Sequence, residues 1–166
     1  YACAARMDDA ASIARKAVAI LRGADISFGS ATLGSLALAS PDEGERRDAL
    51  DEGRRAAGGG GLAFEALYFW RLAAEVAVRD RDWQALDAAA DRIEALTARE
   101  PLPWGQVVVG GARLLARLGR GETAEALRGE AREAVRRTEA AGHMTLARPL
   151  RAAFGLLETD YAGPRR

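Results

Sequence analysis

Apolar side chains recur every three or four residues along most of the chain, with polar residues between them. This spacing places an apolar stripe along a helix and predicts a mostly α-helical protein. Glycines, prolines and short charged runs divide the pattern into seven or eight helices. The expected helices cover roughly residues 8–22, 27–39, 41–57, 62–79, 82–99, 104–118, 123–140 and 145–157. No segment has the strict alternation of a half-buried strand.

The apolar stripes also predict which helix faces are buried. In the first helix the apolar set is Ile13, Ala17 and Ile20, flanked by Ala14, Val18 and Leu21. The helix over residues 62–79 has a broad apolar arc, so we expect it to pack on two sides. One face carries Leu62, Ala66, Phe69, Ala73 and Val76, and the other carries Leu67, Trp70, Ala74 and Ala77. The remaining stripes are expected at Trp83, Leu86, Ala90, Ile93 and Leu96; at Val107, Gly111, Leu114 and Leu118; at Leu127, Ala131, Ala134 and Val135; and at Leu146, Leu150, Phe154 and Leu157.

Two breaks in the pattern are especially informative. Ser40 and Pro41 resemble a capping residue followed by proline at the first helical position. The segment Glu100-Pro101-Leu102-Pro103-Trp104 breaks the chain, because proline does not fit inside a helix. The two prolines stiffen the approach to Trp104, so we expect its ring to be largely buried. Truncation of such a ring to alanine costs about 3–5 kcal/mol.

A small-plus-apolar step recurs along the chain, at Ala10-Ala11, Ala49-Leu50, Ala85-Leu86 and Ala126-Leu127. Intervals of roughly 34–47 residues are typical of stacked two-helix repeats. The sequence therefore predicts an all-α, tetratricopeptide-like array of antiparallel helical hairpins, a right-handed α-solenoid; a non-repetitive helical bundle is the alternative. We expect one domain over residues 1–158 and a disordered tail over residues 159–166.

The turn from Leu118 to Leu127 resembles a tetratricopeptide turn, with glycine after one helix and an acidic-Ala-Leu entry to the next. Together with the Pro-Leu-Pro-Trp segment and Gly111-Ala112-Arg113, it resembles the C-terminal repeat region of large bacterial signalling proteins. In those proteins a class III adenylate/guanylate cyclase domain is joined to an ATPase domain. The resemblance covers about Leu62–Phe154. It implies a non-catalytic interaction or regulatory module, and the cyclase and ATPase signatures lie outside this chain.

Composition narrows the class of protein only modestly. The chain carries 24 basic and 24 acidic residues, which favours neither nucleic acid nor a membrane surface as partner. No apolar run reaches the ~18 residues of a membrane span. Cys3 is the single cysteine, so no internal disulfide can form and a cytoplasmic location is expected. The chain begins with Tyr1, and we expect it to be a piece of a larger protein.

The distribution of charge is less even than its total. Residues 1–100 carry 13 basic and 17 acidic side chains, whereas residues 101–166 carry 11 and 7. The basic excess in the second part is compatible with an acidic partner, but we favour a solvated helix face as its explanation. Arg128, Arg132 and Arg136 form a ridge that suits nucleic acid or an acidic peptide, and here too we favour a solvated face.

Catalytic patterns are not found in the sequence. The Gly58–Gly61 run continues without the Gly-Lys-Ser/Thr of a phosphate loop. His143 is the single histidine and has no cysteine nearby, so neither a zinc site nor general base catalysis is indicated. We therefore expect no enzyme activity, no cofactor and no metal from this chain.

The candidate binding residues lie on the first helix of each pair, which lines the concave surface in two-helix arrays. They are Phe64, Tyr68, Arg71 and Glu75, followed by Gln106, Arg113 and Arg117. Aromatic and arginine side chains are frequent anchors for peptides. The alternative is that the aromatic residues belong to the core.

The expected partner is a protein or peptide, or another domain of the same parent chain. Apolar ends of the array are also expected to associate, giving a homodimer at high concentration. Two other functions stay open at this stage. One is the repeat domain of an ATPase-type transcription activator, and the other is a helical domain that binds a small molecule.

Overall fold

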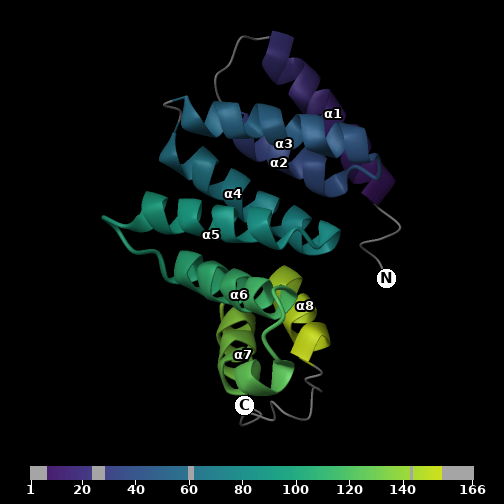
Figure 1. Cartoon of the computed structure of the whole chain (residues 1–166). Coiled ribbons are helices and arrows are strands. Elements are labelled where there is room, and N and C mark those ends of the chain that lie inside the picture. Colours follow the sequence, from purple (N-terminus) through teal and green to yellow (C-terminus); the bar gives the residue numbers. More distant parts are fainter. Residues whose placement is uncertain (1–6, 24–28, 60–61, 143, 155–166) are drawn as a thin grey trace. The chain divides into compact units, whose positions relative to one another are not determined.

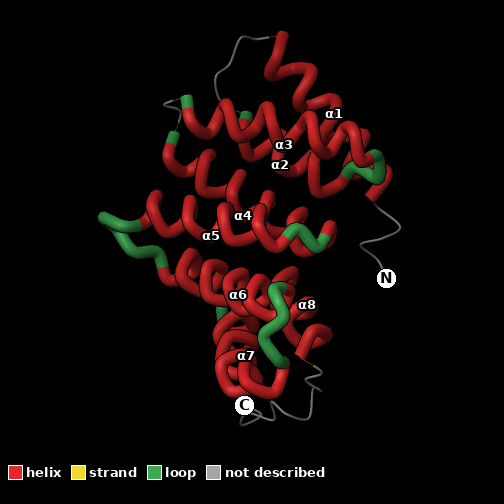
Figure 2. Tube along the Cα trace, viewed as in Figure 1, coloured by secondary structure: helices red, strands yellow, loops and turns green. Residues whose placement is uncertain are grey.

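A computed structural model describes residues 7–23, 29–59, 62–142 and 144–154 of the chain, and these residues form helices joined by short loops (Figures 1 and 2). Eight helices and no strand are found in these ranges, which confirms the all-α prediction. The helices are α1 (Met7–Gly23), α2 (Ser30–Ala39), α3 (Glu43–Gly58), α4 (Ala63–Asp80), α5 (Trp83–Thr97), α6 (Pro103–Gly119), α7 (Ala124–Ala140) and α8 (Met144–Phe154).

The chain divides into two compact units, Tyr1–Val76 and Ala77–Arg166, and the boundary falls inside α4. Each unit has its own buried apolar residues and is described by itself. A single domain over residues 1–158 stays a prediction. The expected tail at residues 159–166 lies outside the described part of the chain.

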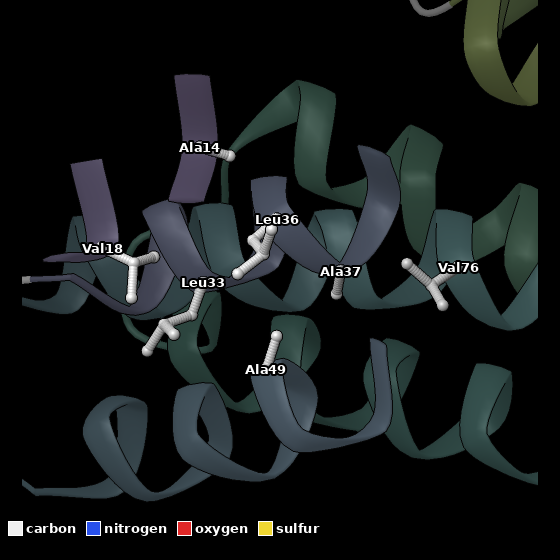
Figure 3. Packing of buried hydrophobic residues seen from close by; sticks show 7 residues of the cluster. All are labelled: Ala14, Val18, Leu33, Leu36, Ala37, Ala49 and Val76. Atoms are coloured by element: carbon white, nitrogen blue, oxygen red, sulfur yellow. The ribbon is translucent and has the colours of Figure 1, made fainter. Parts of the chain in front are cut away.

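The core of the first unit gathers side chains from four helices. Figure 3 shows this cluster, in which α2 contributes more members than any other helix. Its seven labelled residues are Ala14, Val18, Leu33, Leu36, Ala37, Ala49 and Val76. Five of the seven are alanine or valine, and Leu33 and Leu36 are the larger members, so small side chains separate the helices at most of these positions.

Glycine makes the closest of these approaches possible. The ring of Phe69, fully buried, lies against Gly53 of α3, where a Cβ atom would come within 2.2 Å of the ring. On α2, a Cβ at Gly34 would lie 3.1 Å from Leu72 and 3.3 Å from Phe69. The two glycines therefore form the surface on which this face of α4 packs.

The apolar face predicted for the first helix is wrong at its two isoleucines and correct at the flanking Ala14 and Val18. Ile13 and Ile20 are 67% and 69% exposed, and the buried residues of α1 are Ala11, Ala14 and Val18. The buried stripe is thus rotated away from the largest aliphatic side chains. The small side chains of Ala14 and Val18 belong to the same buried cluster as the larger Leu33 and Leu36 of α2.

The start of α3 also differs from the prediction. Asp42 caps the helix, and its Oδ1 accepts a hydrogen bond from the Glu45 N–H at 2.7 Å. Ser40 is the buried C-cap of α2, and its hydroxyl donates to the Glu45 carboxylate. Pro41 therefore precedes the cap and does not open the helix. Ser27, where the second helix is expected to begin with its side chain as a candidate N-cap, lies outside the described residues.

The second unit is built around α6, which contacts α5, α7 and α8. Gly119 at the end of α6 lies under the Trp83 indole, where a Cβ would come within 2.3 Å of the ring. At the other end of the pair, Gly105 faces Ile93 and Thr97. These contacts show that α5 and α6 run antiparallel and pack closely along their whole length.

Two turns of similar design reverse the chain in this unit. At Arg81 (φ 55°), the Asp82 N–H donates to the Ala77 carbonyl, and Asp82 then caps α5 through the Ala85 N–H. At Gly121 (φ 100°), the Glu122 N–H donates to the Arg117 carbonyl, after which Thr123 caps α7. Both are left-handed C-terminal motifs followed immediately by a side-chain N-cap.

Several predicted core residues of α4 to α8 lie elsewhere. Leu62 and Leu96 are exposed, and Trp104 is only partly buried. We therefore expect Trp104→Ala to cost less than the ~3–5 kcal/mol of a fully buried aromatic. Leu150 and Phe154 are buried, so they do not provide the exposed apolar end that was expected to support a homodimer. Leu157 lies outside the described residues.

The contact between Gly53 and Phe69 can be tested by adding one methyl group. Gly53→Ala forces the buried ring to move, and we expect it to lower the free energy of unfolding by about 1–3 kcal/mol. Gly129 is a matched control, since it is exposed in the middle of α7 and a Cβ there meets no atom within 4 Å. Gly129→Ala should raise stability by about 0.5–1 kcal/mol. Urea denaturation of both variants measures the difference, and equal effects would contradict the packing described.

Candidate functional site

The four candidate residues on α4 form a continuous row. The Phe64 and Tyr68 rings lie with their centroids 4.6 Å apart, and the Arg71 guanidinium lies 5.9 Å from the Tyr68 centroid. Phe64 is 60% exposed and Tyr68 is 39% exposed. The alternative that these two aromatic residues belong to the core is therefore wrong.

Glu75 differs from the other three residues of this row. Its side chain is buried, and its Oε1 accepts a hydrogen bond from Arg71 Nη1 at 2.6 Å. Burial separates this carboxylate from any partner at the surface. We expect Glu75 to hold Arg71 beside the Tyr68 ring, where a cation is attracted to the aromatic face.

The other three candidate residues, Gln106, Arg113 and Arg117, line an open groove between α6 and α7. We call it the α6–α7 groove; its volume is about 600 Å³. The remaining residues from α6 are Pro103, Val107, Gly110, Gly111 and Leu114, and the α7 wall consists of Glu130, Glu133, Ala134 and Arg137. The floor is apolar and the rims are charged. Both helices are drawn in green in Figure 1.

The arginines of the groove are already paired with carboxylates. Arg117 donates to Glu122 and, across the groove, to Glu130 at 2.9 Å. These hydrogen bonds raise the pKa of Arg117, and Arg117 lowers the pKa of Glu122. Arg113 donates to Asp91 and Glu94 of α5, at 3.1 and 2.6 Å.

The same holds for the acidic wall of the groove. Glu133 accepts hydrogen bonds from Arg136 and Arg137, which lower the pKa of its carboxyl group. Arg120 pairs with Asp87, and Arg151 pairs with Glu139. Much of the basic excess of residues 101–166 is therefore engaged in ion pairs within this unit, which weakens the case for an acidic partner.

Sequence reasoning found the α6 side of the groove and missed the α7 side. Glu130, Glu133 and Ala134 belong to the second helix of a pair, which was expected to lie away from the binding surface. The signal that could have found them is Gly110-Gly111, because adjacent glycines inside a helix weaken it and usually serve a packing role.

A smaller hollow of about 360 Å³ lies in the first unit, over α1, α2 and α3. Arg15 and Glu45 of its lining form an ion pair, and Arg22, also in the lining, pairs with Glu52 of α3. Both pairs join residues thirty positions apart, which shows that α1 and α3 run parallel. The Arg15 pair is bidentate, at 2.6 and 2.7 Å. Hydrogen bonds from Arg15 and then Ser40 lower the pKa of Glu45 to about 2.

The described residues contain no group of three or more His, Cys, Asp or Glu side chains arranged to hold a metal ion. None of the described helices is both long enough and apolar enough to cross a membrane. His143 lies outside the described residues. No protein-family model, curated protein or solved structure matches this chain.

The carboxylate of Glu45 should make the first unit sensitive to acid. Its folded-state pKa is about 2, below the ~4.3 of an unperturbed glutamate. The stabilisation is therefore complete above about pH 5 and is lost as pH falls towards about pH 2. Glu45→Gln should be less stable than wild type near neutral pH, and the difference should vanish near pH 2. Arg15→Gln should behave alike, because it removes the main cause of the shift. Chemical denaturation followed by circular dichroism, repeated from neutral pH down to about pH 2, tests this. Plots of the free energy of unfolding against pH that run parallel for wild type and the two variants would contradict the prediction.

Proposed function

We propose that this chain is a non-catalytic protein-interaction module, and that the α6–α7 groove is its peptide-binding surface. The observation that carries the proposal is the groove itself, with an apolar floor and charged rims. Three of the seven residues selected from the sequence, Gln106, Arg113 and Arg117, line it. Such a combination of apolar floor and polar rim is typical of protein interfaces.

The repeated turn design supports a tetratricopeptide-like array as the underlying architecture. The reversals at Arg81 and Gly121 share a left-handed residue and an immediate N-cap, as expected of equivalent hairpins in a series. In this proposal the residues from Leu62 to Phe154 are a repeat region of a bacterial, cyclase-linked signalling protein. The resemblance of the Pro-Leu-Pro-Trp segment and of the Gly119–Gly121 turn supports that setting.

A second candidate function is the binding of a small molecule in the same groove. Its volume of about 600 Å³ lies within the range of ligand sites, roughly 300–1,000 Å³. The groove is open along its length and its arginines are already paired, however. We therefore favour an elongated peptide as the occupant.

Filling the groove provides a direct test. Gly110 lines the groove, and a Cβ there meets no atom within 4 Å, so Gly110→Leu should place a side chain in the groove without disturbing the fold. Peptides selected by the wild-type chain from a displayed random library should lose at least about tenfold in affinity for this variant, equivalent to about 1.4 kcal/mol.

Gly129→Leu is the matched control, because it makes the same substitution at an exposed position of α7 outside the groove. Its affinity for the selected peptides should stay within about twofold of wild type. Peptides that bind all three proteins equally would place the binding surface elsewhere. The small-molecule candidate would be favoured if a metabolite or nucleotide, and no peptide, bound wild type and Gly129→Leu but not Gly110→Leu.

A further inference from the structure

We infer that the occupant of the α6–α7 groove is a helix of a partner protein, with an apolar stripe and uncharged flanks. This inference rests on the proposed function and specifies the chemistry of the partner. It follows from three properties of the groove: its pairing of charges, its small number of uncharged hydrogen-bonding groups for a peptide backbone, and its small floor residues.

The charges of the groove are balanced within the unit. Arg113 and Arg117 each contact two carboxylates, and Glu133 contacts two arginines. An acidic occupant would have to displace carboxylates from the arginines, exchanging one ion pair for another of the same kind. It would also lie beside Glu130 and Glu133. A basic occupant would have to displace arginines from these carboxylates in the same way. Neither an acidic nor a basic occupant therefore gains net ion-pair energy by binding.

The backbone of an occupant must also be satisfied. An extended peptide needs partners for its N–H and C=O groups wherever it is removed from water. The floor consists of Val107, Gly110, Gly111, Leu114 and Ala134, whose side chains offer no hydrogen bonds. Gln106 is the one uncharged polar side chain of the lining, and a single amide is too few for the backbone of an extended segment. The charged side chains are engaged in ion pairs, those of Arg113 with Asp91 and Glu94 of α5. A helix meets its own backbone requirement, which makes it the fitting occupant.

The shape of the floor agrees with this conclusion. Gly110 and Ala134 are the small lining residues beside the larger Val107 and Leu114, whereas a Cβ at Gly111 would lie 3.2 Å from Leu150 of α8. Small residues at a contact allow a helix to approach closely, while the flanking apolar side chains meet its stripe. The lining runs from Pro103 to Arg117, which at 1.5 Å per residue is about 21 Å, or about four helical turns.

Four synthetic peptides of about fourteen residues test the inference. Three share a leucine stripe at helical spacing and differ on the opposite face, which carries glutamine, glutamate or arginine. The fourth is the glutamine peptide with two central glutamines replaced by proline, so that it cannot form a helix. Fluorescence anisotropy measures their binding to wild type, Gly110→Leu and Gly129→Leu at about 50 and about 500 mM salt.

The glutamine peptide should bind wild type at least about tenfold more tightly than the other three, with less than about threefold change between the two salt concentrations. Its affinity should fall at least about tenfold in Gly110→Leu and stay within about twofold in Gly129→Leu. Tighter, salt-sensitive binding of a charged peptide would overturn the inference. Equal binding of the proline peptide, or no binding of the glutamine peptide, would also overturn it.

These outcomes separate the inference from the function on which it rests. If the charged or the proline peptide binds wild type and is lost in Gly110→Leu, the groove is a peptide site of different chemistry from the one inferred. If neither these peptides nor any library peptide depends on Gly110, the groove is not the binding surface at all, and both the proposed function and the inference fail.

Discussion

The close approach of helices through glycine is the constraint on which both units depend. Phe69 occupies the place where a side chain at Gly53 would lie, and Trp83 does the same at Gly119. In both contacts an aromatic ring of one helix lies directly against the backbone of an adjacent helix. The geometry tolerates little change, because a methyl group at either glycine would overlap an aromatic ring. A core made largely of alanine thereby obtains tight packing without many large side chains.

Much of this fold could be predicted from periodicity and from helix-breaking residues. The eight helices lie near the expected positions, since glycine, proline and capping residues mark their ends directly in the sequence. The choice of buried face was less predictable. For α1, the isoleucines Ile13 and Ile20 are the most hydrophobic side chains, but the buried face is decided by packing against the other helices of the unit, which the pattern of a single helix does not reveal.

The candidate site shows the same division between local and tertiary information. Gln106, Arg113 and Arg117 share one face of α6 because of helical periodicity, which the sequence states plainly. Their ion pairs with residues of α5 and α7, and the hollow beneath them, depend on how the helices pack. The sequence shows Arg113 and Arg117 as two positive charges on one helix face, whereas in the folded unit both are paired with carboxylates. This pairing favours an uncharged partner over an acidic one in the proposed groove.

The position of α6 in its unit has a thermodynamic consequence. This helix contacts α5, α7 and α8, and it also contributes one wall of the groove. A bound partner would therefore contact the helix that makes the most interhelical contacts in the unit. Because the groove exists only when these helices are packed, partner concentration and folding are linked by mass action. At a hundredfold excess over Kd, such linkage is worth about 2.7 kcal/mol. Occupancy would therefore lengthen the lifetime of the unit against proteases, and the abundance of the protein in a cell would follow that of its partner.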